Sequence, residues 1–125
     1  MPLAPGLSAR LELTVTEADT ALALGSGDVP VLGTPRLVAL AEEACCRAIA
    51  AQLGDDETTV GMRVQLDHLA PTAVGMAVTA EATLEKVEGR RLTFTCSAND
   101  PHGLIAAGKL TRVVVERDRF LKKSL

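Results

Sequence analysis

Aromatic residues are almost absent from this 125-residue chain, which has no Trp, no Tyr and two Phe. Proteins that bind single-stranded nucleic acid use aromatic side chains to stack on the bases. Basic residues do not replace them, because 13 Lys and Arg stand against 16 Asp and Glu. The two basic doublets, Arg90-Arg91 and Lys122-Lys123, are too short to attract a phosphate backbone. We therefore expect no nucleic-acid partner.

Long apolar runs and cysteine motifs are also missing. No run reaches the roughly 18 residues of a membrane-spanning helix, and the first ten residues hold two prolines and no basic segment before an apolar core. The three cysteines include an adjacent pair, Cys45-Cys46, and no C-x-x-C spacing. This pattern favours neither a disulfide framework nor a zinc site. We expect no membrane contact, no metal and a cytoplasmic location.

The composition that remains is that of a globular protein, with 47% hydrophobic and 23% charged residues. The length suits one domain, so we expect a single domain over residues 1–125 with flexible termini at about 1–9 and 121–125. Residues alternate between apolar and polar in five segments, which is typical of half-buried strands. The segments are 10–16, 60–69, 76–87, 91–98 and 104–116.

One segment has helical periodicity. Thr34-Pro35 is a strong helix start, with Thr34 as the expected N-cap, and Gly54 is expected to end the helix after Leu53. At 100° per residue, an apolar stripe forms along one face of this helix: Leu37, Leu40, Ala41, Ala44, Cys45, Ala48 and Ala51. One helix and five strands joined by hairpins predict an α+β fold, with the helix against an antiparallel sheet.

A single helix leaves part of so long a sheet uncovered, and an uncovered edge needs a partner. We therefore expect a homodimer with pockets between the subunits. The segment Gly25-Ser26-Gly27-Asp28-Val29-Pro30 reads as a flexible loop, and such a loop beside a pocket often acts as a lid.

Two adjacent glutamates lie in the helix at different angles. Glu43 falls on the polar face beside Arg47, where a surface ion pair is expected. Glu42 falls at the margin of the apolar stripe. It is either a general base or a glutamate whose carboxylate reaches out to water.

Two further side chains have both a structural and a chemical interpretation. His68 is expected to share a strand face with Val60, Met62, Val64 and Leu66, as either a packed core histidine or an acid–base group. Thr34 either only caps the helix or also offers its hydroxyl where a helix N-terminus stabilises a bound carbonyl.

Other candidates are weaker. Gly61 interrupts a strand, which marks a bulge or a close approach. His102 is expected in a solvated turn. Ser26 lacks the G-x-S-x-G spacing of a nucleophile elbow, and Cys45 reads as a small buried residue.

The order of elements resembles the hotdog fold, in which a sheet wraps a long helix. Several segments are similar to the fluoroacetyl-CoA thioesterase family of hotdog proteins: Gly33-Thr34, residues 38–48 (VALAEEACCRA), Val60-Gly61, residues 67–72 (DHLAPT) and residues 87–92 (VEGRRL). The resemblance spans about Leu11 to Phe120.

The resemblance implies a catalytic threonine, glutamate and histidine. The threonine eight positions before the glutamate matches Thr34, the glutamate before x-Ala-Cys matches Glu42, and the histidine matches His68. Gly61 and Arg112 match a glycine and an arginine expected to bind substrate. The family's lid phenylalanines have no counterpart in residues 27–32, so the resemblance implies a general short acyl-CoA rather than fluoroacetyl-CoA alone.

We therefore predict an acyl-CoA thioesterase that releases a free acid and CoA, with no cofactor other than the CoA of the substrate. The predicted assembly is a homodimer, which can pair into a tetramer. The alternative is a non-catalytic module that binds or senses acyl-CoA. A hotdog hydratase is a third option, but that branch has an Asp and a following His near the helix, and this helix contains no His.

Overall fold

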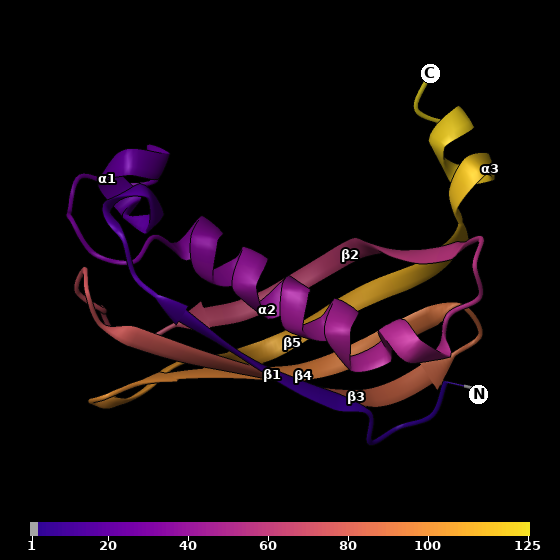
Figure 1. Ribbon diagram of the computed structural model, residues 1–125, viewed down its shortest axis with the longest axis horizontal. Helices are drawn as coiled ribbons and strands as arrows, with labels where there is room; N and C mark the ends of the chain where they lie inside the picture. Colours follow the sequence, from indigo (N-terminus) through magenta and orange to yellow (C-terminus); the bar gives the residue numbers. More distant parts are fainter. Residues whose placement is uncertain (1–2) are drawn as a thin grey trace.

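A computed structural model describes residues 3–125, and one antiparallel five-stranded sheet dominates it (Figure 1). The sheet order is β1-β3-β4-β5-β2, so β1 and β2 form its edges. The expected α+β architecture is confirmed. The strands are β1 (Ser8–Thr14), β2 (Glu57–His68), β3 (Ala77–Glu88), β4 (Arg91–Asp100) and β5 (Gly103–Glu116). The helices are η1 (Glu17–Asp19), α1 (Ala21–Leu24), α2 (Thr34–Ile49), η2 (Ala50–Gln52) and α3 (Arg117–Lys122).

Helix α2 lies along one face of the sheet and packs mainly against β1 and β3 (Figure 1). The buried side chains of its apolar stripe are Leu37, Leu40, Ala41, Ala44, Cys45 and Ile49. Ala48 is half-buried and Ala51 is exposed. Ala51 leaves the predicted stripe because α2 ends at Ile49 and the 3₁₀ turn η2 changes the angle between residues.

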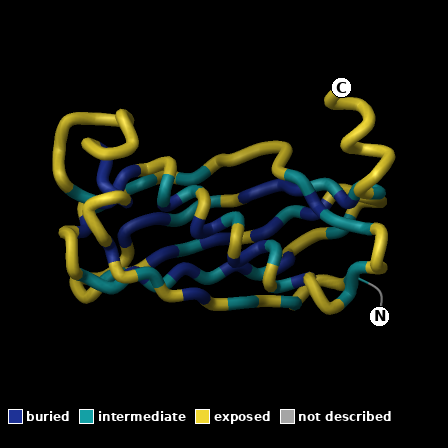
Figure 2. Tube along the Cα trace, turned by 45° about the horizontal axis from the view of Figure 1, so that its top comes forward, coloured by how far each residue is buried: buried dark blue, intermediate teal, exposed yellow. Residues whose placement is uncertain are grey.

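The core lies between α2 and the sheet, where buried residues alternate along the central strands (Figure 2). Cys45 on α2 and Cys96 on β4 meet there with their sulfur atoms 3.6 Å apart, and both are free thiols. The Cys96 thiol and burial raise the pKa of Cys45. A thiol held protonated in this way is a packing group, as the sequence predicted for Cys45.

Strand β2 contains a bulge that changes which side chains face the helix. The register with β5 shifts between Gly61, which pairs with Arg112, and Arg63, which pairs with Thr111. Met62 is the extra residue, so residues before and after it follow different alternations. The expectation that Val60 shares a face with Val64, Leu66 and His68 is therefore wrong: Thr59 and Gly61 take the helix-facing positions before the bulge.

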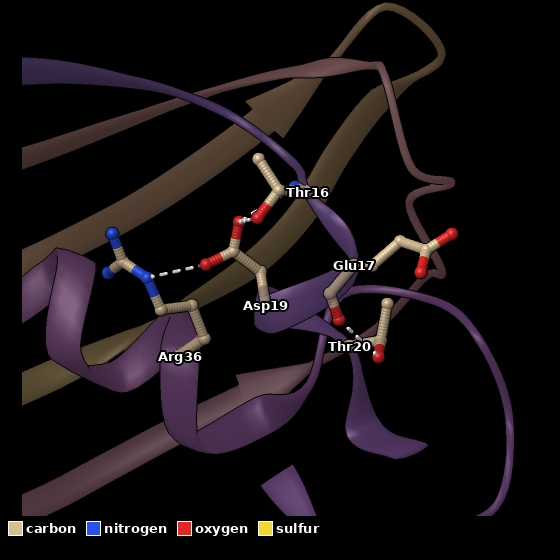
Figure 3. Close-up of polar contacts among 5 residues, drawn as sticks. All are labelled: Thr16, Glu17, Asp19, Thr20 and Arg36. Atoms are coloured by element: carbon tan, nitrogen blue, oxygen red, sulfur yellow. Dashed lines mark hydrogen bonds and ion pairs between the residues drawn. The ribbon is translucent and has the colours of Figure 1, made fainter. Parts of the chain in front are cut away.

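A buried carboxylate holds the start of α2. Asp19 accepts hydrogen bonds from the Thr16 backbone and hydroxyl at 2.7 and 2.9 Å, and from Arg36 Nε at 3.0 Å (Figure 3). Its backbone carbonyl accepts from Gly33 at 2.9 Å. Burial raises the pKa of Asp19, but these hydrogen bonds outweigh burial and hold the pKa below its ordinary value. Asp19 thus ties η1 to the first turn of α2.

The ends of the chain differ in part from the expectation. Met1 and Pro2 lie outside the described residues. Ser8 and Ala9 belong to β1, and Leu121 and Lys122 belong to the short helix α3, which the sequence pattern did not predict. The flexibility of the remaining terminal residues stays a prediction.

Candidate active site

The first part of the site is a contact between α2 and the end of β2. The Thr34 Oγ1 and His68 Nδ1 atoms lie 2.7 Å apart. The expected cap is corrected here: Gly33 is the N-cap of α2, in extended conformation, and Thr34 is the first helical residue. Glycine is accepted at this position, and the Thr34 hydroxyl is directed to the histidine instead of the helix backbone.

The His68 ring is half-buried, and the bulge places it on the helix side of β2. Burial lowers its pKa below the ordinary value of 6.5, and the Ala70 backbone offsets part of this effect. The ring is therefore neutral at pH 7. Within residues 3–125, its buried Nε2 atom has no hydrogen-bond partner, and a buried polar atom in that state is costly unless it serves a purpose.

The second part of the site is an ion pair between α2 and β5. Glu42 Oε2 lies 2.7 Å from Arg112 Nη1, and the Glu42 side chain is 34% exposed against 9% for Arg112. Two contacts to Thr59 fix the guanidinium, one from Nε to the hydroxyl and one from Nη2 to the carbonyl, both at 3.0 Å. Arg112 thus holds the carboxylate from the side of the sheet, while the Glu42 side chain remains partly accessible to solvent.

Gly61 is required by this ion pair. A Cβ atom built at Gly61 would lie 2.6 Å from Glu42 Oε2 and 3.5 Å from Arg112 Nη1, and real Cβ contacts are essentially never under 3.0 Å. The sequence predicted either a bulge or a close approach at Gly61, and the structure has both. Arg112 was expected to bind substrate; its guanidinium contacts Glu42 and Thr59, and contact with a substrate stays a prediction.

The two parts of the site are separated along the helix. Thr34 and Glu42 are eight residues apart, which corresponds to about 12 Å of helix axis. The structure therefore joins Thr34 to His68, and Glu42 to Gly61 and Arg112, as two groups within one chain.

A pocket of about 370 Å³ opens beside Thr34 and His68. Its walls come from the loop after α1 and from the connection after β2, and they include Val29, Val31, Leu32, Leu69 and Pro71. Ser26 also lines the pocket, without the strand-to-helix elbow of a serine nucleophile. The loop expected to act as a lid thus lines the same pocket as Thr34 and His68.

The remaining candidates have structural roles. Glu43 forms the expected surface ion pair with Arg47 at 3.0 Å. His102 is exposed in the turn before β5, as predicted. In residues 3–125, no three His, Cys, Asp or Glu side chains are grouped so that they could hold a metal ion. None of the helices in this described part is long and apolar enough to cross a membrane.

Sequence reasoning missed two residues that hold the site, Thr59 and Asp19. Thr59 precedes Gly61 by two residues, but nothing in its neighbourhood indicates that it bonds Arg112. Asp19 has a visible signal, since it lies three residues after Thr16 and forms a capping box with it. That signal predicts a short helix and does not reveal the bond to Arg36.

Comparison with known proteins places this geometry in a family. The family model described as fluoroacetyl-CoA-specific thioesterase matches residues 15–118. The fluoroacetyl-CoA thioesterase of Streptantibioticus cattleyicolor is 39% identical over 93 residues, which are 74% of this chain and 67% of that protein.

Solved structures agree over almost the full length. The fluoroacetyl-CoA thioesterase FlK matches with a TM-score of 0.93 and 31% identity, covering 99% of this chain and 96% of that one. A Thermus thermophilus member of the thioesterase superfamily matches with a TM-score of 0.90 and 30% identity, covering 98% and 91%. The expected hotdog fold and the expected activity class, thioester hydrolysis, are thereby confirmed. The chain belongs to the fluoroacetyl-CoA-specific thioesterase family.

Proposed function

We propose that this chain hydrolyses the thioester bond of small acyl-CoA molecules and releases the free acid and CoA. The observation that carries the proposal is the 2.7 Å contact between Thr34 and His68 beside a pocket, on the same helix as a carboxylate held in place by Arg112. Among the similar proteins, one FlK variant was solved in complex with fluoroacetate and CoA.

Thr34 and His68 form the part of the site that receives the thioester. The positive end of the α2 dipole lies at Thr34, where it favours the negative charge that develops on a carbonyl oxygen under attack. When the proton of the neutral His68 ring is on Nε2, the Nδ1 atom accepts a hydrogen bond from the Thr34 hydroxyl. The Nε2–H group is then available to donate to the departing CoA sulfur.

Glu42 supplies the group that starts the reaction. As a general base it removes a proton from water, whose oxygen attacks the thioester carbon; the C–S bond breaks, and the thiolate is protonated. As a nucleophile its carboxylate attacks the thioester carbon, the C–S bond breaks and CoA leaves as the thiolate, which takes up a proton; water then hydrolyses the mixed anhydride to the free acid and restores Glu42. In both routes Arg112 holds the carboxylate, and Gly61 gives it room.

We also propose that the active form is a homodimer joined through β2. This strand is an edge of the sheet, so one side of its backbone has no strand partner within residues 3–125. Met62 and Val64 are each 45% exposed on it. A second chain on this edge would cover both residues and bring a second Glu42 group toward the Thr34–His68 pair, which is about two helical turns from the Glu42 of its own chain.

The proposed reaction needs no cofactor beyond the CoA that leaves as product. We place it in the cytoplasm, since free cysteines such as Cys45 and Cys96 suit a reducing compartment.

The activity test compares two adjacent glutamates. Glu42→Ala should lower the rate of thiol release from acyl-CoA by about 100-fold to 10,000-fold, the usual contribution of an acid–base group. Glu43→Ala is the matched control and should stay within about twofold, because it removes only an exposed ion pair. Thiol release is measured with acetyl-, butyryl- and benzoyl-CoA. Full activity of Glu42→Ala would refute the assignment, and binding without turnover by the unaltered chain would favour the acyl-CoA-sensing alternative.

Gly61→Ala should leave the chain folded but displace the Glu42 carboxylate, because the new methyl group meets the flexible end of that side chain. We expect a fall of about 100-fold in kcat, the usual effect of a misplacement of about 1 Å. Gly54→Ala is the control, since its Cβ would meet only Glu57 at an ordinary 3.4 Å. Circular dichroism verifies folding, and unchanged kcat in Gly61→Ala would contradict the proposed role of Glu42.

The His68 ring should titrate below pH 6.5, because burial lowers its pKa. If the reaction needs the neutral His68 ring, the enzyme should stay active as the pH falls through 6.5 and should lose activity only at lower pH, where the ring becomes protonated. NMR titration can follow both histidines of the chain, and His102→Gln identifies the remaining signal as His68. The acid limb of kcat/KM should coincide with that midpoint. A midpoint at or above 6.5 would count against this role.

The dimer is tested by mass. Sedimentation at micromolar concentration should give about twice the 13.1 kDa of the chain. Val64→Glu should shift the protein toward monomer and lower activity with it, since a charge would be buried at the interface. Leu121→Glu, on the exposed helix α3, should change neither. A monomeric unaltered chain that retains full activity would overturn this assembly.

A further inference from the structure

One residue of the pocket beside Thr34 and His68 has no role in the proposed reaction. Within residues 3–125, Asp28 is the one Asp, Glu, Lys or Arg side chain that lines this pocket. The other walls away from the catalytic pair are aliphatic or small, as at Val29, Leu69 and Pro71.

Asp28 is held next to the pocket by the backbone around it. The Leu22 N–H donates to the Val29 carbonyl at 3.2 Å, and the Ala21 N–H donates to the Val31 carbonyl at 2.9 Å. These bonds close the loop that contains Asp28 against α1. The residue therefore belongs to an anchored part of the loop, directly before Val29.

The charge of Asp28 is not neutralised nearby. None of the ion pairs in the described chain includes Asp28. The other titratable side chain that lines this pocket is His68, which is neutral at pH 7 because burial lowers its pKa. A ligand in this pocket thus meets one negative charge without a compensating positive one.

The size of the pocket and the aliphatic part of its lining, which includes Val29, Leu69 and Pro71, suit an alkyl chain. Its 370 Å³ correspond to about twelve water molecules at about 30 Å³ each, whereas an acetyl group has three non-hydrogen atoms. Each additional methylene that leaves water for the aliphatic wall improves affinity by about fourfold. The pocket therefore has room for an acyl group of several carbons and gains affinity from it.

We propose that Asp28 selects the acyl group by charge: the pocket accepts uncharged aliphatic acyl groups of several carbons and rejects those that end in a carboxylate. This inference rests on the proposed thioesterase function and names its substrate class. The physical cause is repulsion between like charges, which discriminates against the wrong ligand without any added contact to the right one.

The test uses two substrates with the same number of carbons, valeryl-CoA and glutaryl-CoA, which differ by a terminal methyl or carboxylate. The unaltered enzyme should have the higher kcat/KM for valeryl-CoA. Asp28→Asn should raise kcat/KM for glutaryl-CoA by about fivefold, the effect expected for two charges about 4 Å apart in a solvated site, and leave valeryl-CoA unchanged. Asp55→Asn, at an exposed turn at the other end of α2, should alter neither value.

Salt provides a second readout that a purely structural effect of the substitution would not reproduce. The difference between the unaltered enzyme and Asp28→Asn should shrink as ionic strength rises from about 0.01 M to 1 M, because salt screens exposed charges. Equal changes for both substrates in Asp28→Asn, or a glutaryl-CoA rate that does not respond to it, would overturn the inference.

Binding separates this inference from the proposed function. If the unaltered chain hydrolyses neither thioester, hydrolysis is refuted, and calorimetry with the same two thioesters still decides the role of Asp28. A dissociation constant for glutaryl-CoA that falls in Asp28→Asn supports the selection by charge. Equal dissociation constants in both proteins refute it.

Discussion

The ion pair between Glu42 and Arg112 is the constraint on which the site depends. The residue Arg112 as a whole is 7% exposed, and a buried charge is costly unless it is paired and hydrogen-bonded. Thr59 supplies two acceptors and Glu42 supplies the third. The pair therefore determines three other features. Helix α2 must lie close to the sheet, residue 61 must be glycine, and the Glu42 carboxylate must point toward the sheet.

A second carboxylate, that of Asp19, fixes the start of the same helix. Asp19 bonds Arg36 through its side chain and Gly33 through its backbone, on either side of Thr34. Helix α2 is therefore held at its start by a loop and near its middle by the sheet. The first attachment lies next to Thr34 and the second includes Glu42, so both candidate site residues are held in place although neither is fully buried.

The α+β order of elements and the position of Glu42 could be predicted from periodicity, whereas the hotdog fold and Arg112 were predicted only from the family resemblance. The 100° step placed Glu42 beside the apolar stripe and Glu43 in solvent, as the structure has them. The N-cap predicted at Thr34 is at Gly33, and the sequence could not show this because the Thr34 hydroxyl bonds His68, 34 residues further along the chain. Nor could the face of Val60 be predicted, because Gly61 indicated either a bulge or a close approach and did not give the register of the strand around it.

The bulge at Met62 has a consequence for how this strand can vary. Gly61 and His68 are seven residues apart, an odd number, and in a regular strand they would point to opposite sides of the sheet. The additional residue restores them to the same side. The number of residues between these two positions is therefore fixed: losing or gaining a single residue there would turn the imidazole toward the back of the sheet, while Glu42, on the helix, would stay in place.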